Sequence, residues 1–229
     1  AVKSGMADDG RGLDAGGDGA TAYAEAVATY LSFAISRLND YNSSIATWKP
    51  SGEQVMQTYK RQAIPMTWDY CEANLLGNAS GSLISVIHQL SKAIEYLPAT
   101  SRGEATQIDA QSIDIGARVV STDPPYYDNI EYADLSDYFY VWLRRCLKPV
   151  FSDLFATVAV QKAEELVANP YRHGGKGGAE TFFLKGMTHA MHRIAEQAHP
   201  AFPVTIYYAF KQVESDDNAG TASTGWDTF

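Results

Sequence analysis

Three scarcities limit what this protein can be: cysteine, basic residues and long apolar runs. The 229 residues include only two cysteines, Cys71 and Cys146, and no Cys-x-x-Cys pair. A disulfide framework or a metal site built by this chain is therefore not expected. So little cysteine is typical of a reducing compartment, and we expect a cytoplasmic protein. No run reaches the roughly 18 apolar residues that cross a bilayer, so we expect no membrane partner.

Basic residues are outnumbered by acidic ones. Lysine and arginine total 18 against 27 aspartates and glutamates, which gives a net charge of −9 and a sequence pI near 5.0. This balance argues against a protein that binds nucleic acid mainly by its overall charge, although a local basic face is compatible with it. The 45% hydrophobic and 20% charged residues are those of an ordinary globular protein, which excludes a disordered, collagen-like or coiled-coil chain.

The pattern of apolar residues divides the chain into three regions. Residues 1–20 are rich in glycine and lack aromatic residues, which predicts a flexible lead-in or linker. Residues 21–100 are predicted to be mainly helical, and residues 101–229 to be an α/β catalytic region.

Within the helical region, two apolar stripes recur at helical spacing. They predict helices over 27–38 and over 83–97, the second stopped by Pro98. A short helix over 53–61 is a weaker expectation.

The third region alternates between strand and helix patterns. Residues 118–122 and 204–210 read as strands and 106–109 as a weaker one, while apolar stripes predict helices over 135–147 and 182–194. A strand, helix, strand order implies a parallel sheet. The segment 204–210 is almost wholly apolar, which suits a central strand covered on both faces.

The most informative motif follows the better of these strands: Asp123-Pro124-Pro125-Tyr126. Ligands of open parallel sheets bind at the carboxyl ends of the strands. Prolines fix the backbone and donate no hydrogen bond, so neighbouring carbonyls are held as acceptors. Asp123 adds another acceptor, and Tyr126 offers a flat face on which a planar ring can stack. The alternative is a rigid strand-to-helix turn without chemistry.

Such a turn suits methyl transfer to an amine nitrogen. The lone pair of an aromatic amine is delocalised into its ring and is a poor nucleophile. Two acceptors on the amine hydrogens raise the electron density on nitrogen, and an in-line methyl donor then supplies much of the rate through positioning. The proton can leave afterwards, so Asp123 need not be a strong base.

The motif and its surroundings resemble the large bacterial and archaeal adenine-specific DNA methylases of the DUF1156 type. The resemblance is carried by residues 119–130 and 132–145, and extends to 162–166, 169–175, 207–211 and 62–69 and to the helix from Tyr23. It implies S-adenosylmethionine as the cofactor, DNA as the partner and a Rossmann-like methyltransferase fold. It also assigns catalytic roles to Asp123, Pro124, Pro125 and Tyr126. In a duplex the target base would be flipped out of the stack.

The sequence departs from the family pattern at the cofactor site. The glycine turn that follows the first strand in relatives is absent, and two good strands and one weak one stand where a full sheet has about seven. We therefore expect a partial methyltransferase fold, an internal piece of a longer enzyme, with the remainder of the parent chain as a partner.

Weaker candidates lie on either side of the motif. Asp109 follows the weak strand, where methyltransferases can place an acidic residue on the cofactor adenine; an ordinary turn aspartate is the alternative. Arg172 and Lys176 lie in a basic, glycine-rich segment that could contact DNA phosphates, or could be a solvated loop.

N6-adenine is the favoured acceptor, and N4-cytosine stays open because the same turn serves both amines. Methylation of RNA guanine or of a protein glutamine is a further alternative, against which Asp123 counts, because those families usually place asparagine first. A catalytically silent scaffold or DNA-binding module is the alternative from another class.

Overall fold

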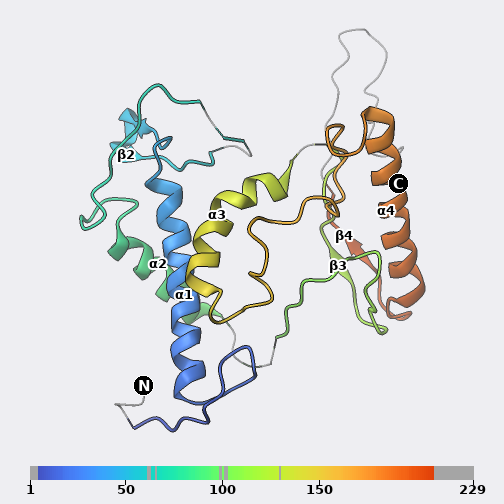
Figure 1. Cartoon of the computed structure of the whole chain (residues 1–229), viewed down its shortest axis with the longest axis horizontal. Helices are drawn as coiled ribbons and strands as arrows, with labels where there is room; N and C mark the ends of the chain where they lie inside the picture. Colours follow the sequence, from blue (N-terminus) through green and yellow to red (C-terminus); the bar gives the residue numbers. More distant parts are fainter. Residues whose placement is uncertain are drawn as a thin grey trace. The chain divides into compact units, whose positions relative to one another are not determined.

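The computed structural model is a mixed α/β protein. It describes residues 5–60, 63–64, 66–97, 100, 103–128 and 130–208. The elements in chain order are α1 (Ala20–Tyr41), β1 (Trp48–Lys49), the short 3-10 helix η2 (Pro50–Gly52), β2 (Gln54–Val55), α2 (Leu83–Tyr96), β3 (Ser121–Thr122), α3 (Tyr132–Leu147), α4 (Lys176–Gln197) and β4 (Thr205–Ile206) (Figure 1).

The chain divides into two compact units. The first joins Ala1–Arg102 with Tyr132–Gln161, and the second joins Gly103–Glu131 with Lys162–Phe229. The first unit therefore holds α1, α2, α3 and the antiparallel β1–β2 pair, and the second holds α4 and the parallel β3–β4 pair.

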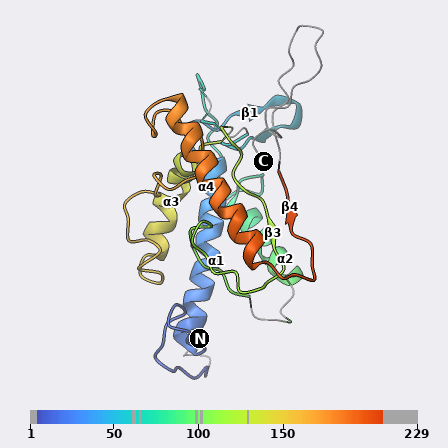
Figure 2. The same cartoon turned by 90° about the vertical axis from the view of Figure 1, so that its right-hand side faces the viewer.

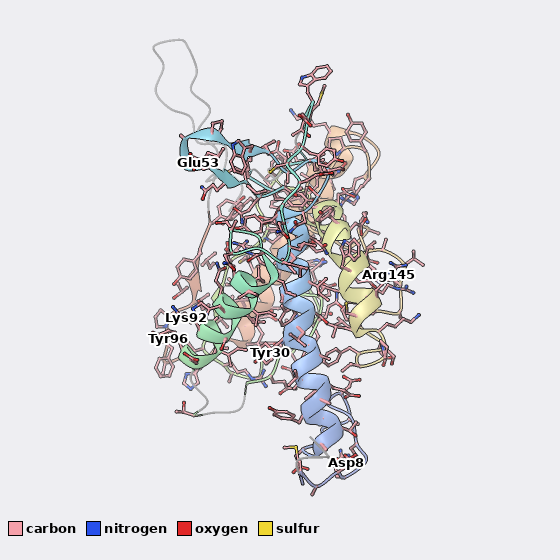
Figure 3. The ribbon with its side chains drawn as sticks, turned by 90° about the vertical axis from the view of Figure 1, so that its left-hand side faces the viewer. Asp8, Tyr30, Glu53, Lys92, Tyr96 and Arg145 are labelled. Carbon is pink, nitrogen blue, oxygen red and sulfur yellow. The ribbon has the colours of Figure 1, made fainter. Side chains whose placement is uncertain are left out.

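Helix α1 is the central element of the first unit, and α2 and α3 both pack against it. Its alanine-rich sequence has a high intrinsic helix propensity. Small side chains at the contacts, such as Ala34 and Ser32, are almost fully buried, which lets the neighbouring helices approach closely. Larger side chains lie outside: Tyr30 on α1 and Tyr96 at the end of α2 are exposed (Figure 3).

The start of α1 has no capping side chain at Gly19. Asp8, which precedes the helix in the sequence, provides the capping acceptor instead. Its Oδ1 accepts from the backbone N–H of Thr21, and its Oδ2 accepts from the Thr21 hydroxyl at 2.9 Å. An acceptor for an otherwise unpaired N–H is what a helix N-terminus needs.

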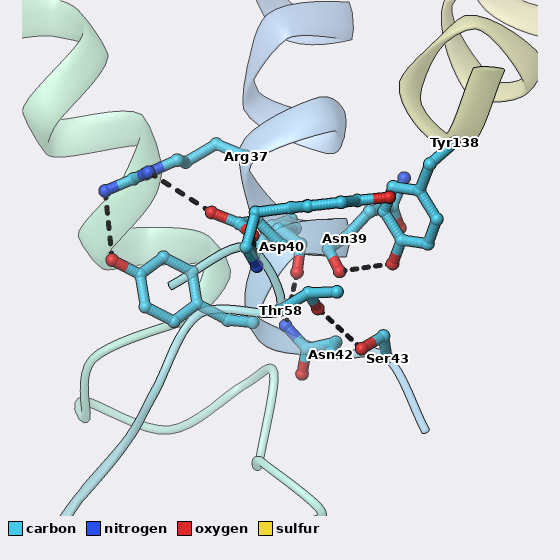
Figure 4. Close-up of polar contacts among 10 residues, drawn as sticks. Arg37, Asn39, Asp40, Asn42, Ser43, Thr58 and Tyr138 are labelled. Carbon is cyan, nitrogen blue, oxygen red and sulfur yellow. Dashed lines mark hydrogen bonds and ion pairs between the residues drawn. The ribbon is translucent and has the colours of Figure 1, made fainter. Parts of the chain in front are cut away.

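Polar contacts hold the other end of α1 to the segment that follows (Figure 4). Asp40 is only 7% exposed, and its Oδ1 accepts from the backbone N–H of Tyr59 at 3.2 Å. Arg37 lies 3.5 Å from its other oxygen. The Tyr138 hydroxyl of α3 donates to the Asn39 carbonyl at 2.8 Å. One buried turn thus connects α1, α3 and residues 58–59.

The structure confirms the four helices that the apolar stripes predicted. The weaker helix expected over 53–61 is wrong where the chain is described: η2 ends at Gly52, and Gln54–Val55 form β2, which pairs with β1. The physical reason lies at Glu53, whose φ of 46° is left-handed (Figure 3 marks it beside this pair) and cannot continue a right-handed helix.

The strands are confirmed in direction but are short. β3 and β4 pair in parallel, as the strand, helix, strand order predicted. The weak strand over 106–109 is wrong, because Asp109 instead opens a turn closed by the N–H groups of Ser112 and Ile113. The expected cover on both faces of 204–210 is also wrong where the chain is described: Ile206 is 43% exposed. Residues 209–210 lie outside the described residues.

Within the described residues, no helix has the length and hydropathy needed to cross a bilayer.

The Asp8 contacts predict a measurable titration. The Thr21 hydroxyl and N–H, with the Gly10 N–H, hold the pKa of Asp8 below its usual range. Because the folded pKa is depressed, the contacts stabilise the fold above the unfolded pKa and are lost as the pH falls through the folded value. We expect carboxyl-detected NMR to give an Asp8 midpoint below that of an unfolded peptide. Thr21→Val should raise it.

An internal control is Asp9, whose pKa is lowered chiefly by the backbone N–H of Arg11. Its midpoint should not change in Thr21→Val, and an unchanged Asp8 midpoint would contradict the cap.

The buried turn predicts a stability difference between two substitutions of Asp40. Asp40→Ala leaves the Tyr59 N–H without its acceptor and should lower the free energy of unfolding by about 1–3 kcal/mol. Asp40→Asn keeps an acceptor oxygen and should cost less. Urea titration of the full chain measures both, with the exposed Glu95→Ala on α2 as control. Equal losses for all three variants would contradict the role of Asp40.

Candidate active site

The parallel β3–β4 pair positions the candidate site. Thr205 N–H donates to the Val120 carbonyl at 3.0 Å, and Tyr207 N–H donates to the Thr122 carbonyl at 2.8 Å. The register places Thr122 beside Ile206 (Figure 2 shows the two strands). Because both strands run the same way, the residues that follow them meet at one edge, the position where parallel sheets bind ligands.

The Asp123-Pro124-Pro125-Tyr126 turn occupies that edge. Asp123 is exposed and Pro124 is buried, so the turn is anchored by a proline while its carboxylate stays accessible. The Tyr126 hydroxyl donates to Asp123 Oδ1 at 3.1 Å. The Tyr126 ring packs edge-on against Tyr208, with centroids 5.5 Å apart. A carboxylate and two aromatic rings are thus gathered where the strands end.

Tyr127 fastens the turn to the core of the second unit. Its carbonyl accepts from the Ala168 N–H at 2.7 Å, and its ring packs edge-on against Phe183 with centroids 5.1 Å apart. Phe183 is fully buried in α4 and clusters with Ala168, Ala179 and Met187. Burial raises the pKa of Tyr127, and the charges of Glu180 and Asp128 raise it further.

The two basic candidates, Arg172 and Lys176, differ in how accessible their charges are. Arg172 is bound inside the unit: its Nη1 donates to Glu165 Oε2 at 2.6 Å and to the Lys162 carbonyl at 3.3 Å, and its side chain is 15% exposed. Lys176 is exposed at the first residue of α4. Lys176 is therefore the more accessible cation for a phosphate.

The hydrogen bonds of Asp109 are made within its own turn and not to the motif. Its carboxylate accepts from the backbone N–H of Gln111 at 2.9 Å, a contact within its own turn. This is the geometry of an ordinary turn aspartate. The cofactor role of Asp109 stays a prediction without a supporting contact.

A cavity of about 300 Å³ lies beside the motif, within the second unit. Buried residues of the 165–170 segment and of α4 form its apolar part: Val167, Ala168 and Ala179. Its polar part comprises Asp128, Glu131, Asn169 and Lys176, with Tyr127 and Pro170 completing the lining.

Asn169 is the best-connected residue of the cavity wall. It is 5% exposed, its Nδ2 donates to Glu131 Oε1 at 2.7 Å, and its Oδ1 accepts from the Tyr171 N–H at 2.8 Å. One side chain thus shapes the basic segment and ties it to the chain that follows the motif.

Sequence reasoning missed Glu131, Asn169 and Tyr208 as individual site residues. Asn169-Pro170 is a turn signal, but no local pattern indicates that Asn169 pairs with a glutamate 38 residues away. Among the described residues, no cluster of three or more histidine, cysteine, aspartate or glutamate side chains could hold a metal ion.

Comparison with known proteins adds no relative: the chain matches no protein-family model, no curated protein and no solved structure.

Proposed function

We propose that this chain carries the catalytic turn of an S-adenosylmethionine-dependent amino-methyltransferase that acts on a DNA base, with N6 of adenine as the favoured acceptor. The observation that carries the proposal is the position of Asp123-Pro124-Pro125-Tyr126 directly after β3, at the carboxyl edge of a parallel strand pair. The fold proposed for this region is the Rossmann-like fold of these enzymes.

In this mechanism the acceptor amine donates to Asp123 and its ring stacks on Tyr126. The Tyr126 hydroxyl, which donates to Asp123 Oδ1 at 3.1 Å, holds the carboxylate in one orientation. The packing of Tyr126 on Tyr208 keeps the ring in place. Both contacts reduce the freedom that the reacting groups would lose in the transition state. S-adenosylmethionine supplies the methyl group when bound.

The motif predicts a large loss of activity when either of its end side chains is removed, and a smaller loss when the Tyr126 ring is kept. In a radiolabelled methyl-transfer assay on the enzyme that contains this chain, Asp123→Ala and Tyr126→Ala should each lower turnover by about 100-fold or more, because positioning is lost. Tyr126→Phe keeps the stacking ring and should fall only a few-fold. The exposed Glu164→Ala in the same unit is the control, and circular dichroism checks that each variant folds. Near-normal turnover of Asp123→Ala would refute the proposed role.

The accessible cation predicts a change in salt dependence. Lys176→Ala should weaken DNA binding and reduce the slope of log K against log salt by about one, as expected for one lost phosphate contact. Lys185→Ala, an exposed lysine further along α4, is the matched control. Fluorescence anisotropy at several salt concentrations measures both slopes. Equal slopes for the two variants would show that Lys176 is a solvated surface residue that does not contact a phosphate.

A further inference from the structure

We propose that the cavity beside the motif binds one nucleobase of the substrate strand, a different base from the one that is methylated. The class of ligand rests on the proposed function, and the site itself rests on the cavity and on the Asn169–Glu131 pair.

The size and lining of the cavity suit a single base. About 300 Å³ is at the lower end of the range of ligand pockets, which is room for one base or nucleoside. Val167 and Ala179 are 1% exposed on the apolar side, and Tyr127 adds aromatic surface. A flat, largely apolar ring fits such a wall, with its polar edge toward the polar side.

The Asn169–Glu131 pair supplies the polar recognition. An asparagine amide has two N–H donors and an ionised carboxylate has two acceptor oxygens. Their mutual bond uses one Nδ2 hydrogen and Oε1 of Glu131. A donor and an acceptor are left side by side, and among the described residues no other side-chain partner of either group competes for them. This pair complements a base edge that carries an exocyclic amine next to a ring nitrogen, as in adenine and cytosine.

The same chemistry separates this base from the methylated one. An amine that donates to Glu131 in the cavity is not also presented to Asp123. Neither Asp123 nor Tyr126 lines the cavity. The cavity therefore holds a neighbour of the target, and the strand must present two unstacked bases. Such a strand is easiest to supply as single-stranded or locally unpaired DNA.

The test compares two nucleosides of nearly equal size on the full chain by saturation-transfer NMR, without S-adenosylmethionine. Deoxyadenosine carries the exocyclic amine, and purine deoxyriboside lacks it. We expect deoxyadenosine to bind about tenfold more tightly or better, because its amine donates to a carboxylate. In Glu131→Gln that preference should shrink to a few-fold or less. The variant keeps an oxygen for Asn169, so the fold should survive.

Glu196→Gln is the matched control, since Glu196 is an exposed glutamate in the last turns of α4 and does not line the cavity. It should keep the full preference for deoxyadenosine. A second variant, Asn169→Asp, keeps the acceptor for the Tyr171 N–H and replaces the donor to Glu131 by a like charge. It should weaken binding of both nucleosides.

The proposal is overturned if neither nucleoside binds saturably, if the two bind equally, or if Glu131→Gln keeps the preference. These results are independent of catalysis. A chain in which Asp123→Ala leaves methyl transfer unchanged, while Glu131→Gln loses the nucleoside preference, would refute the proposed function and keep the subsite. The reverse result would refute the subsite alone.

Discussion

The parallel pairing of β3 with β4 is the interaction on which the candidate site depends. Two backbone hydrogen bonds, from Thr205 to Val120 and from Tyr207 to Thr122, bring together segments far apart in the chain. Their parallel direction decides that Asp123 and Tyr208 follow the strands at the same edge. An antiparallel pair in the same place would have put the tyrosine at the far end of the strand from the carboxylate.

The turn after β3 gains its rigidity from neighbours of different chemistry. Its prolines restrict the backbone, and the Tyr126 hydroxyl orients the Asp123 carboxylate. Tyr127 anchors the exit of the turn through its ring on Phe183. Asn169 then ties the next residues to the basic segment. The exposed Asp123 carboxylate is thus held by residues that are themselves packed or hydrogen-bonded, as a preorganised site requires.

The first unit shows a similar division between packing and polar contacts. Small residues of α1 allow close helix contacts, while the Asp40 turn sets the direction in which the chain leaves the helix. Buried polar groups of this kind contribute mainly when both partners are present, because an unpaired buried N–H costs more than the bond itself contributes. In both units, polar contacts therefore fix the direction in which the chain leaves a helix or turn, which the pattern of apolar residues does not determine.

The sequence by itself determined the helices and the position of the motif, because both follow from local rules. Apolar spacing and helix propensity act within a few turns, and the prolines after a β-branched run mark where a strand stops. The parallel direction of β3 and β4 followed from the element order.

Only the tertiary structure decided what those elements contact. The Asn169–Glu131 bond has no local signature, because it depends on two residues that are distant in sequence and lie together only in the fold. The structure also chose between alternatives that the sequence left open at Asp109, which forms an ordinary turn, and at Arg172, which pairs with Glu165. Hydrogen bonds act over about 3 Å, so a pairing between residues 38 positions apart exists only once the chain has folded.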